Sequence, residues 1–329
     1  MTEQKLLGFA KFREVGLVLF IVILSIAVQI RNHEFLTVNN MRNLFTNTAI
    51  LGILSVGMMM VLLTGGIDLS IGATIAFSGM VSAMTVKVYP GIPTVLLVLE
   101  SSFIGAVVGL AVGILVARFS ILPIIASLGM MNIMRGMTYL VSGGAWVSAY
   151  QMPDSFKRMA TNRFLGINNL IVIAIVVYVI FYYFINFTRT GRRIYAIGSN
   201  HEAADIIGLP RKQIVTLVYV LMGFLAGLCG VLWVSKFASA QGDTAAGYEM
   251  SVIASCVLGG VSVSGGRGKV AGLVLGVVLF GILANALPLI NVSPFWQQAI
   301  QGFVILAAII INVIIKRNNN RANLRQRVI

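Results

Sequence analysis

Ten long runs of apolar residues set the solvent in which this chain can fold. Apolar and aromatic residues make up 58% of its 329 residues and charged residues only 10%, whereas soluble domains carry about 25% charged residues. A soluble chain of this length buries roughly three quarters of its surface, which excludes a cytosolic protein of this composition. The runs are residues 15–30, 46–64, 71–89, 93–117, 121–142, 167–187, 213–234, 250–264, 270–290 and 296–315.

Most of these runs are close to the ~20 residues that cross a bilayer core as a helix. Barrel strands would alternate polar and apolar residues over about ten positions, and these runs do not. The pattern therefore predicts an all-α polytopic membrane protein with about ten transmembrane helices, in which residues 1–329 form a single transmembrane domain.

The charge excess predicts how the chain is oriented. Its 24 basic residues outnumber the 10 acidic ones, but they cluster between apolar runs, so membrane orientation explains them better than nucleic-acid binding. With the N-terminus in the cytoplasm, sixteen basic residues fall inside, seven outside and Arg135 within a span. Both termini, including the basic tail of residues 316–329, are therefore predicted to be cytoplasmic. A signal peptide cleaved near Ala27 is the alternative, but nine further spans would place that tail outside.

The longest predicted cytoplasmic loop, residues 188–213, contains signals for a short helix. Asn200 is a suitable N-cap for a helix over residues 202–207. Gly208 then favours a helix end, and Pro210 prevents continuation. A capped helix between two spans is typical of a docking element, and an ordinary basic loop is the alternative.

The same loop resembles the coupling loop of the ribose-type ABC sugar importer permeases. The only departure is at Leu209, where the family carries isoleucine. Further similarity lies in residues 64–72, 247–249, 257–262 and 264–268, so it extends over nearly the whole chain. The matching loop residues are Thr188, Gly191, Arg192, Ile194, Tyr195, Ala196, Gly198, Asn200, Glu202, Ala203, Ala204 and Gly208.

This resemblance implies a permease subunit of the bacterial inner membrane that imports a monosaccharide or small polyol. It implies three partners: a cytoplasmic ABC ATPase, a periplasmic or lipoprotein solute-binding protein, and a second permease copy, identical or paralogous. A permease for a furanosyl signal of the autoinducer-2 type is an alternative within the family. The loop helix would insert into the ATPase through Asn200, Glu202, Ala203, Ala204, Asp205 and Gly208.

The resemblance places ATP and magnesium on the partner and implies no cofactor bound by this chain. The chain's nearest approach to a phosphate-binding loop is Gly268-Lys269, where Val263 and Val270 replace the required glycine and hydroxyl residue. The two histidines, His33 and His201, lie in predicted loops and give no metal site or catalytic centre.

Two glycine-rich breaks, residues 62–72 and 256–266, align at an offset of 194 residues. Such matched breaks often mark broken helices near a transport path, and tight turns are the alternative. The first contains Ser70 and Asp68, an acidic residue whose place beside a span suggests either the path or a helix cap.

Other polar residues within or beside the spans are also candidates for contact with cargo. Asn132, Asn285 and Gln297 could bind hydroxyl groups, although bonds between helices are the commoner use of such side chains. A gradient-driven secondary transporter is the alternative function class. It would usually need a carboxylate or histidine within a span for proton coupling, and only Glu100, a possible partner of Arg135, clearly lies in one.

Overall fold

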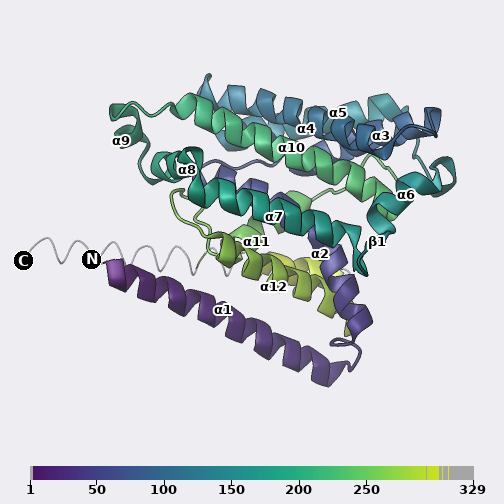
Figure 1. Cartoon of the computed structure of the whole chain (residues 1–329), viewed down its shortest axis with the longest axis horizontal. Coiled ribbons are helices and arrows are strands. Elements are labelled where there is room, and N and C mark those ends of the chain that lie inside the picture. Colours follow the sequence, from purple (N-terminus) through teal and green to yellow (C-terminus); the bar gives the residue numbers. More distant parts are fainter. Residues whose placement is uncertain (1–2, 294, 304–305, 307–309, 311–329) are drawn as a thin grey trace, which may run out of the picture.

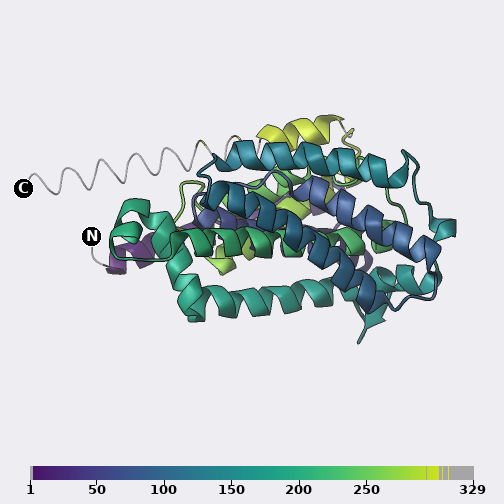
Figure 2. The same cartoon turned by 90° about the horizontal axis from the view of Figure 1, so that it is seen from above.

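The computed structural model describes residues 3–293, 295–303, 306 and 310 of the chain. In these residues the chain forms an elongated bundle of helices that run roughly along one axis (Figures 1 and 2). Strand structure in the described residues is confined to a two-residue hairpin and an isolated bridge. The all-α class predicted from the sequence is therefore confirmed.

Eight helices in the described residues are long and apolar enough to cross a membrane. They match the first seven and the ninth apolar runs. Half of the tenth run and all of the tail of residues 316–329 lie outside the described residues. The total of ten spans and the side of the termini therefore stay predictions. The eight are α1 (Glu3–Arg31), α2 (Val38–Leu63), α3 (Ile71–Val88), α4 (Thr94–Ala117), α5 (Pro123–Ser142), α7 (Asn169–Phe187), α10 (Arg211–Phe237) and α12 (Val270–Leu289).

The eighth apolar run differs from the prediction, because it forms only the short helix α11 (Tyr248–Leu258). Its 11 residues span about 16 Å, roughly half of a bilayer core. The preceding residues, 238–247, connect α10 to α11 as a series of turns. The sequence showed an apolar run here, but not that its helical part is so short.

The remaining elements lie at the two ends of the bundle. One end, called the α9 end here, carries α8 (Arg189–Ser199) and α9 (His201–Ile206). The opposite end carries α6 (Asp154–Thr161) and the hairpin (Figure 1). That end also holds the 3₁₀ turn η1 (Ala149–Gln151), and the hairpin pairs β1 (Arg163–Phe164) with β2 (Ile167–Asn168).

Helices α2 and α10 form the centre of the bundle, and α1 lies at its edge, packed against α12 (Figure 1). Helix α10 packs most extensively on α4. A Cβ atom added at Gly105 would meet the backbone of Gly223 and Gly227, and one at Gly109 would meet that of Tyr219. The glycine spacing thus allows the close backbone approach that small residues permit in lipid.

Candidate functional site

Helix α9 is the short capped helix that the sequence predicted, shifted by one residue. The Asn200 side chain accepts a hydrogen bond from the Ala203 N–H at 3.0 Å, which satisfies a free donor of the first turn. After the helix, Gly208 has φ of +72°, a conformation that glycine adopts without steric cost. The loop prediction is therefore confirmed for the helix and both of its ends.

The outer face of α9 combines acidic and apolar side chains. Glu202 and Asp205 are exposed, whereas Ala204 points into the bundle. Ile206 and Ile207 are 84% and 70% exposed. Neither residue belongs to one of the long apolar helices. Sequence reasoning missed these two isoleucines, although adjacent apolar residues in a predicted polar loop were a signal for a docking surface.

Helix α8 supports α9 and was also missed. Burial raises the pKa of the Tyr195 phenol, so its hydroxyl stays protonated and donates to the Gly268 carbonyl at 2.9 Å. At the end of α8, Gly198 packs so closely on the carbonyl of Leu63 that a Cβ atom would overlap it. The Gly266 N–H donates to the same carbonyl at 2.9 Å. The two glycine-rich breaks therefore meet at α8.

A salt bridge connects α9 to the first residue of α10. The Nε atom of Arg211 lies 3.0 Å from Oδ1 and 3.1 Å from Oδ2 of Asp205. Both side chains are partly exposed, so the pair contributes little to stability. The salt bridge instead sets the position of α9 relative to α10, a long central helix, because only four residues, 207–210, connect the two.

Asp68 and Ser70 lie in the non-helical segment of residues 64–70, which joins α2 to α3. Asp68 is only 2% exposed, and its Oδ1 atom accepts hydrogen bonds from the Ser70 N–H at 2.8 Å and the Ser70 hydroxyl at 2.6 Å. Ser70 is the N-cap residue of α3. The Asp68 carboxylate thus closes a turn directly before α3, and Ser70 makes no side-chain capping bond to the helix. Both roles considered for Asp68 stay predictions.

Arg135 of α5 holds the turns of residues 238–247. Its Nη1 atom donates to the carbonyl of Gly242 at 2.9 Å and to that of Thr244 at 2.7 Å. The suggested partner of Arg135, Glu100, instead accepts a hydrogen bond from the Thr85 hydroxyl at 2.9 Å. Among the described side chains, no ion pair joins Glu100 to Arg135.

Glu249 occupies a position where two helix starts meet. It lies in the first turn of α11 and is 8% exposed. A Cβ atom added at Gly72, in the first turn of α3, would lie 2.6 Å from its Oε2 atom. A carboxylate is stabilised near helix N-termini, which accounts for a buried acid here. No site role was predicted for Glu249, because nothing in the nearby sequence indicates the position of Gly72.

Asn285 lines a polar pocket of about 300 Å³ between α2, α11 and α12. Its side chain exchanges hydrogen bonds with that of Asn40, at 2.9 and 3.1 Å. No charged side chain is among the described residues that line this pocket. The polar residues that do so are Asn47, Thr48, Tyr248, Ser251, Asn285 and Gln301.

The other two polar candidates lie apart from this pocket. Asn132 is exposed on α5 and donates to the carbonyl of Leu128 in its own helix at 3.2 Å. Gln297 donates to the carbonyl of Val292 at 2.8 Å. The structure therefore does not bring the five path candidates together within one chain: Asp68 and Ser70 form one site, and Asn285, Asn132 and Gln297 lie separately.

Comparison with known proteins matches this arrangement to one family. A family model described as "Branched-chain amino acid transport system / permease component" matches residues 40–309. The ribose import permease RbsC of Bacillus subtilis (strain 168) is 38% identical, over 94% of this chain and 96% of its own. RbsC of Escherichia coli (strain K12) is 34% identical, over 95% and 99%. The L-arabinose ABC transporter permease AraH of Azospirillum brasilense is 34% identical, over 93% and 89%. No solved structure matches.

The chain belongs to the ribose-type ABC importer permease family. This permease is thus a multi-pass membrane protein and a transport subunit. Membership in the family implies an ATPase and a solute-binding protein as partners. The family model covers α2 to α12, so both the α9 surface and the polar pocket beside α11 lie within the shared region.

Proposed function

We propose that this permease carries a monosaccharide or a related small polyol into bacterial cells across the cytoplasmic membrane. The supporting observation is the near full-length similarity to two kinds of permease named for sugars, those for ribose and L-arabinose. The pocket beside Asn285 agrees with such a cargo, because amide and hydroxyl groups suit a neutral, hydroxyl-rich molecule and its described lining carries no charge.

The energy comes from ATP, which is bound with magnesium and hydrolysed on a separate cytoplasmic ATPase. In this proposal α9 inserts into a groove of the ATPase, with Ile206 and Ile207 as apolar anchors beside Glu202. The exposure of these side chains supports the assignment, because each gains buried area on docking. Asn200 and Gly208 hold the two ends of α9, and Ala204 holds its inner face.

Two permease copies enclose the path at their shared interface, and a solute-binding protein delivers cargo at the opposite end from α9. The docking loops proposed there are residues 143–166 and 235–249. A bridge between Val147 and Ala240 ties these loops together, so one partner could contact both. The exposed amide of Asn132 is proposed to face the path, since exposure of an amide to lipid is costly.

Asn285 and Gln297 are proposed as further path residues on the second half of the chain. Asp68 and Ser70 are proposed to act on the path through α3, whose first turn they hold. The distinction is testable, since a residue that contacts cargo changes the KM for uptake, whereas a residue that holds a helix changes protein stability.

The decisive experiment measures uptake of labelled ribose and L-arabinose by cells that express this permease with the ATPase and binding protein encoded beside it. We expect E202K to abolish uptake while leaving the protein in the membrane, because it reverses the charge on the docking face. E34K makes the same change at an exposed residue of the opposite end and should retain uptake.

Unchanged uptake in E202K would refute the docking assignment. A proton uncoupler provides a second control. Loss of uptake with the uncoupler, while cellular ATP is maintained, would point to a gradient-driven transporter instead.

A further inference from the structure

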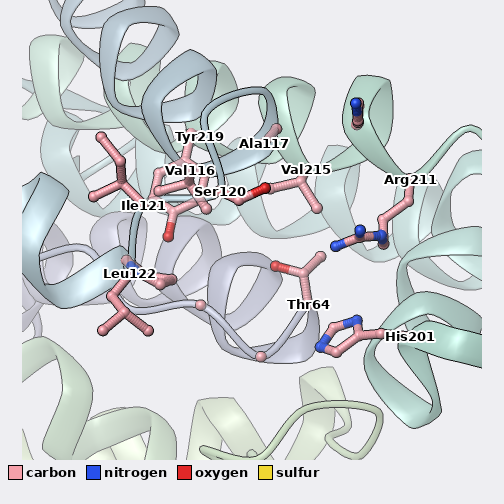
Figure 3. A pocket seen from close by; sticks show the side chains of 14 residues that line it. Thr64, Val116, Ala117, Ser120, Ile121, Leu122, His201, Arg211, Val215 and Tyr219 are labelled. Carbon is pink, nitrogen blue, oxygen red and sulfur yellow. The ribbon is translucent and has the colours of Figure 1, made fainter.

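A second pocket, of about 230 Å³, lies at the α9 end of the bundle. It is bounded by four different elements: the start of the 64–70 segment, the α4–α5 connection, α9 and the first turn of α10. Figure 3 shows the side chains of Arg211, His201, Thr64 and Ser120 around one space, with Tyr219 behind them. None of these residues belongs to the exposed docking face of α9.

The lining of this pocket carries positive charge from Arg211 and Lys212, and it includes the imidazole of His201. No acidic side chain is among the described residues that line it. The nearest carboxylate partner, Asp205, contacts only the Nε atom of Arg211. In the described part of the chain the two terminal nitrogens of that guanidinium have no hydrogen-bond acceptor, and Figure 3 shows them directed toward Thr64.

Hydroxyl groups and an apolar wall complete the pocket. The Ser120 hydroxyl has no hydrogen-bond partner among the described residues, so it is free to donate. The Thr64 and Tyr219 hydroxyls are already used, because they donate to the carbonyls of Val61 and Ile67. Val116 and Leu122 line the other side with apolar surface.

We propose that this pocket binds the phosphoryl group of a small organic phosphate. The terminal nitrogens of Arg211, the Lys212 ammonium and the Ser120 hydroxyl hold the phosphate oxygens, and Val116 and Leu122 contact the carbon skeleton. Phosphate sites typically use the planar guanidinium of arginine, which can donate two hydrogen bonds, and the compact ammonium of lysine. A soluble phosphate monoester and a phospholipid headgroup carry the same group, and the experiment below distinguishes them.

Occupation of the pocket would affect α9. A phosphate on the terminal nitrogens places a second negative charge beside Asp205, which binds the Nε atom of the same guanidinium. Repulsion between the two anions weakens the pair that connects α9 to α10. In this way an intracellular phosphorylated compound would change how the permease presents its docking helix. This regulatory consequence depends on the proposed function, whereas binding itself does not.

Binding is measured on the full-length permease in detergent without added lipid, using inorganic phosphate, glycerol 3-phosphate and uncharged glycerol as probes. Calorimetry should detect both phosphates and not glycerol. R211Q should weaken phosphate binding by about tenfold or more, because it removes a charge-assisted hydrogen bond. D205N should tighten it by about threefold, because it removes the carboxylate that repels the phosphate.

A matched control separates a built site from general surface charge. R189Q removes one positive charge from an exposed residue of the same end, outside the pocket, and should leave phosphate affinity unchanged. If R211Q unfolds, K212Q and S120A serve in its place, with thermal unfolding measured for each. Equal affinity in wild type and all three pocket variants would overturn the proposal, as would equal weakening by R189Q.

The lipid arm uses the permease in nanodiscs of phosphatidylglycerol. A lipid ligand is supported if wild type retains tightly bound phosphatidylglycerol that R211Q and K212Q lose. In that case glycerol 3-phosphate should not bind in the nanodisc. Glycerol 3-phosphate binding that persists in the nanodisc supports a soluble source. Absence of both the lipid and the soluble ligand from wild type would overturn the proposal.

Discussion

The segments of residues 64–70 and 238–247 both connect two helices without being helical, but different contacts hold them. In the first, Asp68 accepts hydrogen bonds from Ser70, two positions further on. In the second, Arg135 donates to two carbonyls from another helix, 107 and 109 positions away. The first segment is also held from α10, where the Tyr219 hydroxyl donates to the Ile67 carbonyl at 3.2 Å. Only the second segment receives its charged donor from α5.

This difference indicates which connection can change during transport. The first segment is also tied at its start, where Leu63 accepts from Gly266 and contacts Gly198. A movement of α5 would leave those contacts intact but would pull on Gly242 and Thr244. We therefore expect the 238–247 segment, and the start of α11 behind it, to be the part that responds to α5.

The largest expected effect follows from removing Arg135. R135A leaves two backbone carbonyls without their charged donor and should cost about 3–5 kcal/mol of stability, with loss of uptake. R135K keeps one ammonium donor and should recover part of both. Thermal unfolding in detergent and uptake in cells measure the two effects, and wild-type behaviour of R135A would contradict the account of the second segment.

A smaller effect is expected at Asp68. D68A leaves the buried N–H of Ser70 without an acceptor and should cost about 2 kcal/mol of stability, whereas D68N keeps an amide oxygen and should cost less. Because Asp68 is buried and its hydrogen bonds go to Ser70, the KM for uptake should not change in those molecules that fold. A raised KM in D68N with normal stability would instead place Asp68 in contact with cargo.

The smallest effect is expected from T244V. It removes the hydroxyl that accepts the Gln241 N–H at 3.1 Å, which should cost about 1 kcal/mol of stability. This variant is informative in double mutants. The stability effects of substitutions at contacting sites are non-additive, whereas those at distant, independent sites add. T244V should be non-additive with R135A and additive with D68N, as judged by thermal unfolding. Additivity in both pairs would remove the distinction between the two segments.

The sequence predicted α9 well because every signal for it is local. Asn200, Gly208 and Pro210 act within a few residues of the helix they delimit. The two functions considered for Asp68 could also be named in advance, since its hydrogen bonds are with the neighbouring Ser70. The family resemblance pointed to the same loop.

What the sequence could not predict depends on contacts between distant residues. Helix α8 was included in the predicted loop of residues 188–213. Gly191 and Gly198 lower helix propensity there, yet both pack directly on backbone, at Ile185 and Leu63. The partner of Arg135 depends likewise on residues more than a hundred positions apart. The cationic pocket gathers residues from four separate segments, none of which suggests it alone.

The glycine contact between α4 and α10 has a mechanical consequence. Their backbones touch without side chains between them, so neither helix can rotate against the other without steric overlap. In the proposed coupling, force applied at α9 reaches a stiff unit of two helices. We therefore expect the hinge of the transport movement outside this unit, among the peripheral helices and the connections that join them to it.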